Sequence, residues 1–125
     1  MGNAKLWVFA ALSAFLLAGC GVNPQTQLDR YTSVYVNIGE RAVELREPCV
    51  LVGPEDPGCV LDDAAYAKFR IIQTTVDGYI KAAEAQIELG EEDNARFYLK
   101  NIAGSLIALA DRVGMSASET AEELE

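Results

Sequence analysis

Residues 48–60 read PCVLVGPEDPGCV, and this stretch divides the chain into its helical parts. It holds three prolines and two glycines, a density typical of a structured loop. Pro48 is expected to end a preceding helix, because proline lacks the backbone N–H and clashes with the turn before it. Asp62 and Asp63 follow, and either can cap the N-terminus of a new helix. The stretch therefore predicts a connection between two helices.

Apolar residues recur at steps of three and four on both sides of this loop, which is the spacing of one helix face. Between residues 27 and 47 the row consists of Leu28, Tyr31, Tyr35, Ile38, Ala42 and Leu45. After the loop it consists of Ala65, Phe69, Ile72, Val76, Tyr79, Ala83 and Ile87. After the acidic sequence EEDN it consists of Ala95, Leu99, Ile102, Leu106, Leu109 and Val113. Gly90 and Gly114 are expected to end the second and third helices. The pattern predicts an all-α fold, a small antiparallel three-helix bundle.

The N-terminal residues differ in composition from the rest. Lys5 and the amino terminus are positive, whereas residues 6–19, LWVFAALSAFLLAG, carry no charge. A positive start, a short apolar stretch and small residues are typical of a secretory signal peptide. Two alternatives remain open. The apolar run extends to Val22, near the lower length limit for an uncut membrane anchor, or it forms a buried core helix.

The apolar run ends in Leu17-Ala18-Gly19-Cys20. This motif resembles the lipobox of bacterial lipoproteins, in which Leu, a small residue and Gly or Ala precede a cysteine. The resemblance covers the first twenty residues and implies that Cys20 receives a diacylglycerol and becomes the first residue of the mature protein. Gly21, in place of Asp, implies sorting to the outer membrane by the enterobacterial rule, with the domain facing the periplasm.

These observations predict four parts. Residues 1–19 are the lipoprotein signal peptide, and residues 20–27 are the lipidated cysteine with a short polar tether. Residues 28–114 form the helical periplasmic domain. Residues 115–125 form an acidic tail with few large apolar groups, which is expected to be mobile.

Lipidation of Cys20 leaves Cys49 and Cys59 as a pair. Because cysteine pairs usually oxidise outside the cytoplasm, we expect a disulfide that clamps the loop between the first two helices. A metal site, a redox couple and a bond between two chains are the alternatives. The first lacks further ligands, and the second usually has a Cys-x-x-Cys spacing.

Composition argues against several classes of function. The net charge is −9, the pI is near 4.4 and the chain has no histidine. Nucleic-acid binding needs a basic surface, and histidine is the commonest general base and metal ligand. We therefore expect no enzymatic activity, no nucleic-acid partner, no small-molecule substrate and no cofactor or metal beyond the lipid on Cys20. The acidic group Glu91, Glu92 and Asp93 is a conceivable cation site, but a solvated helix start explains it better.

Two groups of residues are candidates for contact with a protein partner. Tyr31 and Tyr35 lie one helical turn apart and either pack in the core or form a recognition patch. Val50, Leu51 and Val52 lie in the clamped loop, whose rigidity would limit the entropy lost on binding.

The sequence thus predicts a membrane-anchored lipoprotein that serves as a small binding or structural module in the cell envelope, with an envelope protein as its partner. The lipid would confine the domain near a membrane-associated partner and raise its effective concentration. The alternative is an envelope inhibitor or phage-type exclusion factor that blocks a receptor or a hydrolase.

Overall fold

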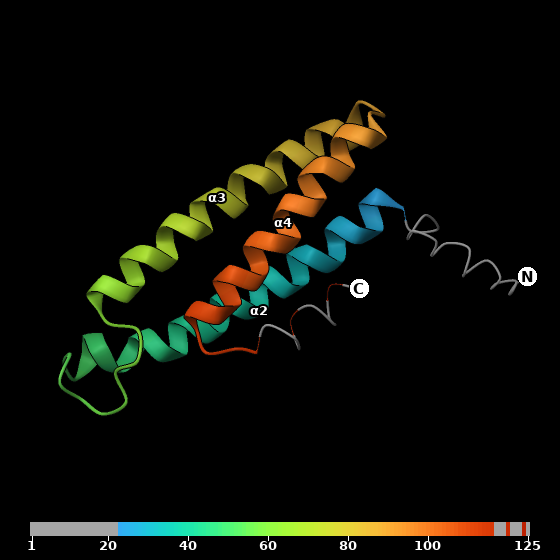
Figure 1. The fold of residues 1–125 in the computed structure, drawn as a ribbon. Coiled ribbons are helices and arrows are strands. Elements are labelled where there is room, and N and C mark those ends of the chain that lie inside the picture. Colours follow the sequence, from blue (N-terminus) through green and yellow to red (C-terminus); the bar gives the residue numbers. More distant parts are fainter. Residues whose placement is uncertain (1–22, 117–119, 121–123, 125) are drawn as a thin grey trace, which may run out of the picture.

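The computed structural model describes residues 23–116, 120 and 124. Within these residues the chain forms three helices and no strand (Figure 1). They are α2 (Pro24–Leu51), α3 (Asp63–Glu88) and α4 (Glu92–Arg112). The predicted all-helical class and the three predicted helices are confirmed.

Helix α2 begins earlier than the sequence predicts. The Oδ1 atom of Asn23 accepts a hydrogen bond of 2.7 Å from the backbone N–H of Gln25, which caps the helix. Pro24 follows at the first helical position, where its missing N–H costs nothing and its fixed φ suits the helix. The predicted tether through Gln27 is therefore wrong for residues 24–27, which are helical.

Helix α2 also ends later than predicted. Pro48 lies inside it, and the helix continues to Leu51. Near a C-terminus the proline removes only one hydrogen bond, and its carbonyl accepts from the N–H groups of Val52 and Gly53, both at 3.0 Å. The prediction that Pro48 ends the helix is wrong, because proline weakens a final turn without preventing it.

The ends of α3 and α4 follow the sequence closely. The carboxylate of Asp62 accepts from the backbone N–H of Ala65 and caps α3, as predicted. Gly90 and Gly114 adopt φ of 75° and 76° beyond the ends of α3 and α4. At the first of these ends, Glu91 N–H donates to the carbonyl of Gln86, which is the long hydrogen bond of a Schellman motif.

The core lies among the three helices. Figure 1 shows α3 and α4 side by side and joined by a short turn, and α2 contacts both. Most predicted apolar positions are buried, and the largest fully buried side chains include Phe69, Ile38, Leu61, Leu99 and Ile102. Leu61, which precedes the cap of α3, belongs to this core although it lies outside every predicted row.

Described residues of the C-terminal tail pack against the helices. Leu124 is 7% exposed and belongs to the core cluster, and Met115 packs against that cluster. Thr120 is buried, and its hydroxyl donates to the carbonyl of Ser116 at 2.9 Å. For these residues the predicted mobile tail is wrong, because apolar groups spaced along it reach the core.

None of the helices formed by residues 23–116 is both long enough and apolar enough to cross a membrane. Cys20 and the lipobox residues Leu17, Ala18 and Gly19 lie outside the described residues.

Candidate functional site

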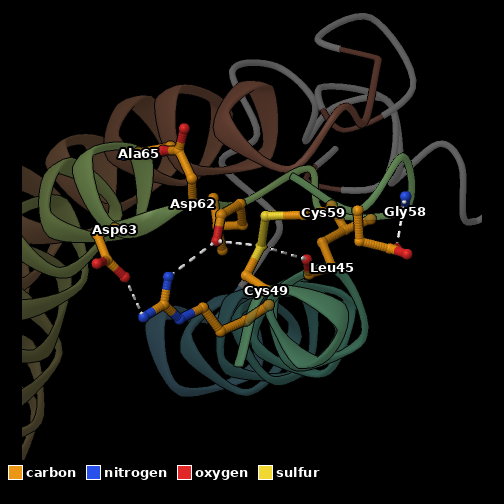
Figure 2. Close-up of a disulfide and its surroundings, with 10 residues drawn as sticks. Leu45, Cys49, Gly58, Cys59, Asp62, Asp63 and Ala65 are labelled. Atoms are coloured by element: carbon orange, nitrogen blue, oxygen red, sulfur yellow. Dashed lines mark hydrogen bonds and ion pairs between the residues drawn. A yellow bond between two sulfur atoms is a disulfide. The ribbon is translucent and has the colours of Figure 1, made fainter. Parts of the chain in front are cut away.

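A disulfide joins the last turn of α2 to the connection that leads into α3. Cys49 lies in the helix, Cys59 lies in the connection, and their Cα atoms are 4.6 Å apart (Figure 2). The predicted disulfide is confirmed. The Cys49 sulfur also lies 3.2 Å from the carbonyl oxygen of Leu61. This is a contact and not a hydrogen bond, because a disulfide sulfur carries no hydrogen.

The connection inside the clamp is held by its own backbone. Gly53 adopts φ of 141°, a conformation that side chains disfavour. Its carbonyl accepts from Asp56 N–H at 3.1 Å, and the carbonyl of Asp56 accepts from Cys59 N–H at 2.8 Å. The Asp56 carboxylate accepts from Gly58 N–H at 2.8 Å (Figure 2). The clamped loop is therefore ordered by consecutive turns as well as by the disulfide.

Arg46 ties the same end of α2 to the start of α3. Its guanidinium donates to the carbonyl of Leu61 at 3.1 Å and to the carboxylate of Asp63 at 2.6 Å. It also lies 4.8 Å from the centre of the Tyr66 ring, within the range of a cation–π interaction. The side chain of Asp63 is 95% exposed, so this ion pair fixes geometry more than it adds stability.

A groove of about 430 Å³ opens beside this clamp, between the C-terminal half of α2 and the N-terminal half of α3. Its floor and sides are largely apolar. From α2 they comprise Gly39, Ala42, Val43, Arg46, Glu47, Val50 and Leu51, and from α3 they comprise Tyr66, Phe69, Arg70 and Gln73. Val50, Leu51 and Val52 are 65%, 73% and 70% exposed, so the predicted contact residues are accessible. Their predicted place in a loop is wrong for Val50 and Leu51, which lie in the last turn of α2.

The two predicted contact tyrosines lie elsewhere. Tyr31 is 6% exposed and packs in the core, so the contact role proposed for it is wrong and core packing holds. Burial raises the pKa of its hydroxyl, against a smaller opposing effect of the positive charge of Arg30. Tyr31 is buried because it continues the apolar row that begins at Leu28.

Tyr35 is partly buried and bridges α2 to α3. Its hydroxyl donates to the carboxylate of Asp77 at 2.8 Å and lies 3.2 Å from the carbonyl oxygen of Gln73. Burial raises its pKa most, and the hydrogen bond and negative charge of Asp77 raise it further. Because this hydroxyl is already bonded within the chain, Tyr35 is better suited to joining helices than to recognition.

The groove also contains residues that the sequence does not predict as contact residues, chiefly Val43, Tyr66 and Arg70. One feature of the sequence predicts part of the groove. Val36, Val43 and Val50 recur every seven residues, beside the apolar row that forms the core. All three are exposed large hydrophobic residues. A second apolar row on a helix that already has one indicates a second surface to cover.

Among the described residues, no group of three or more His, Cys, Asp or Glu side chains is arranged to hold a metal ion. Glu92 and Asp93 lie in the first turn of α4, where the helix dipole favours acidic side chains, and Glu91 occupies the N-cap position without a capping hydrogen bond from its side chain. Comparison of the chain with family models, with curated proteins and with solved structures found no match.

Proposed function

We propose that this chain is a bacterial lipoprotein that acts, without catalysis, as a small binding or structural module of the cell envelope. The groove beside the disulfide, with the exposed apolar side chains around it, is its contact surface for a protein partner. The proposed anchor is lipidated Cys20, and the proposed location is the outer membrane with the domain in the periplasm.

The observation that supports this proposal is the length of α2, which separates its N-terminal end from the groove along its C-terminal half. Helix α2 begins at Pro24, so only three residues separate it from Cys20, and the connection spans at most about 14 Å. The helix has 28 residues, which correspond to about 42 Å at 1.5 Å per residue. A lipid on Cys20 would therefore hold one end of the domain at the bilayer while α2 carries the groove at its other end.

The contacts of α2 support an antiparallel bundle, which we include in the proposal. Arg46, near the end of α2, contacts Asp63 at the start of α3. Tyr35, nearer the middle of α2, contacts Asp77 further along α3. Contacts that advance in opposite directions along two helices are those of antiparallel neighbours.

The anchor is tested by labelling cells with radioactive palmitate. The full chain should incorporate the label and fractionate with the outer membrane, and Cys20→Ser should abolish both. Cys49→Ser is the matched cysteine control and should remain labelled. Labelling of Cys20→Ser would contradict the proposed anchor.

The contact surface is tested by affinity capture from solubilised envelopes. Val50→Asp and Leu51→Asp should lose a partner that the parent chain retains. Ile71→Asp is the control, because Ile71 is 68% exposed on α3 and does not line the groove. Equal capture of the partner by all variants would exclude the groove as the contact surface. Capture of a receptor or a hydrolase that the chain inhibits would favour the inhibitor alternative.

A further inference from the structure

The groove between α2 and α3 has the size and shape of a site for a slender ligand. Its volume of about 430 Å³ falls in the lower part of the range of small-molecule sites. Its residues on α2 run from Gly39 to Leu51, which spans about 18 Å at 1.5 Å per residue. The groove therefore has room for one extended hydrocarbon chain.

Apolar side chains form both the floor and the rim of the groove. Ala42 and Phe69 line it from the two helices and are 3% and 1% exposed, so they form its floor. Val43, Val50 and Leu51 also line it, and each of these is more than half exposed. A hydrocarbon chain laid along them would remove apolar surface from water, which is the main source of affinity for an apolar ligand.

The contacts between the helices place Arg70 toward one end of this groove. Arg46 on α2 contacts Asp63 on α3. Tyr35, earlier in α2, contacts Asp77, later in α3. Because Arg70 is midway between Asp63 and Asp77 in the chain, it lies level with the part of α2 midway between Arg46 and Tyr35. This is the end of the groove that lies away from the disulfide.

Arg70 brings a positive charge that no carboxylate of residues 23–116 neutralises. It takes part in none of the ion pairs that these residues form, whereas Arg46 is paired with Asp63 at 2.6 Å. Arg70 donates to the side-chain oxygen of Gln73 at 2.7 Å. Its planar guanidinium has further N–H donors, whose geometry suits a carboxylate.

We propose that the groove binds a long-chain fatty acid, with its carboxylate at Arg70 and its hydrocarbon chain directed along Val43 toward Leu51. Glu47 lines the groove near the disulfide and would repel a carboxylate there, which sets the direction of the chain. The inference goes beyond the function proposed above, which requires no small molecule. The acid is a bound ligand and not a substrate. Because it would cover Val50 and Leu51, it would compete with the protein partner proposed for them.

Photolabelling of isolated envelopes that contain the full chain tests the inference. The probe is a palmitic acid analogue with a diazirine at the end of its hydrocarbon chain, added without ATP so that it is not incorporated into the lipid anchor. Irradiation should attach it to α2 near Leu51, and excess oleate should prevent the labelling. Excess methyl oleate, which has the same chain without the charge, should compete less well.

Gly39→Leu tests whether the ligand lies in the groove. Gly39 lines the groove, and a Cβ atom added there would meet nothing within 4 Å, so the helix accommodates a leucine that fills the groove. Gly78→Leu is the matched control, because Gly78 lies inside α3 with the same free space but does not line the groove. Gly39→Leu should abolish the labelling near Leu51, and Gly78→Leu should retain it. Circular dichroism should show unchanged helix content in both variants. Labelling of Gly39→Leu at the level of the parent chain would overturn the inference.

Arg70→Gln tests the position of the carboxylate. It should lower the labelling roughly threefold, the effect of one exposed ion pair, and should remove the advantage of oleate over methyl oleate. Arg41→Gln is the control, because Arg41 is exposed on α2, pairs with Glu44 and does not line the groove. Equal labelling of these two variants would overturn the proposed contact with Arg70.

The outcomes separate this inference from the proposed function. Labelling that oleate does not prevent, or that is equal at exposed residues of α4 such as Phe97, would overturn the inference. The groove would then remain a contact surface for a protein, which the capture experiment with Val50→Asp and Leu51→Asp decides. Labelling in the groove that oleate prevents, without capture of any protein, would support the inference and overturn the proposed function.

Discussion

Tyr35 on α2 donates its phenolic hydrogen to the carboxylate of Asp77 on α3, with 2.8 Å between the two oxygen atoms. Together with Arg46 and Asp63 further along, this contact fixes how α2 lies against α3. Tyr35→Phe should therefore lower the free energy of unfolding by about 1 kcal/mol, the typical net contribution of such a bond. Urea unfolding followed by circular dichroism at pH 7 measures the loss. Tyr98→Phe is a control, because the contacts of Tyr98 are made by its ring.

The same bond predicts a dependence on alkaline pH. The folded state raises the pKa of Tyr35 above its ordinary value of 10.0, so the folded state holds the proton more tightly than the unfolded chain. The resulting stability is complete below pH 10 and is lost as the pH rises above it. Between pH 8 and pH 11 the unfolding free energy should fall more for the parent chain than for Tyr35→Phe. Parallel pH dependence of the two proteins would contradict the role given to this hydroxyl.

The sequence predicts the helices well, because each apolar row has a regular period and the ends of α3 and α4 carry strong local signals. Asp62 and Gly90 act where local chemistry places them, as a cap and as a residue with positive φ. Pro24 and Pro48 mislead because a proline is compatible with both the first and the last turn of a helix. Whether a proline lies inside a terminal turn depends on neighbouring groups that supply hydrogen bonds, such as the side chain of Asn23.

The groove is harder to predict, because it depends on the distance between two helices. Val50 and Leu51 can be predicted as accessible apolar residues between the two cysteines, although they lie in α2, and the disulfide can be predicted from the cysteine pair. Tyr66 and Arg70 come beside them only when α3 packs at its observed position. Tyr31, in contrast, lies in the core where its period places it, because it continues the apolar row that begins at Leu28.

Replacing Gly90 and replacing Gly78 by alanine should have opposite effects on the unfolding free energy, because of the two only Gly90 has a backbone conformation that favours glycine. Gly90 adopts φ of 75°, where an alanine is strained, so Gly90→Ala should lower the unfolding free energy by about 1 kcal/mol. Gly78 lies inside α3, and an added Cβ would meet nothing within 4 Å. Gly78→Ala should therefore raise the unfolding free energy by up to about 1 kcal/mol. Thermal unfolding of both variants checks the opposite signs, and equal signs would contradict the assignment.

Removal of the disulfide should destabilise the domain without unfolding it. The bond closes a short loop with a sequence separation of 10, for which loop entropy gives about 3 kcal/mol. Cys49→Ser combined with Cys59→Ser should lower the unfolding free energy by about this amount. Amide hydrogen exchange should accelerate most in the last turn of α2, which contains Pro48 and is held by the clamp. Exchange that accelerates equally in α4 would show that the clamp acts on the whole fold.

The packing of the tail gives a prediction that the sequence alone does not. Leu124 is 7% exposed, so Leu124→Ala should lower the unfolding free energy by about 2 kcal/mol, the lower range for a buried leucine. Leu89 is 71% exposed, and Leu89→Ala should change it by less than about 0.5 kcal/mol. Chemical unfolding of both variants in the full chain measures the difference. If Leu124→Ala matched the control, the tail would add nothing to the stability of the core. A loss near 2 kcal/mol would mean that residues after Gly114 belong to the folded unit, because only a side chain packed in the native state can contribute that much.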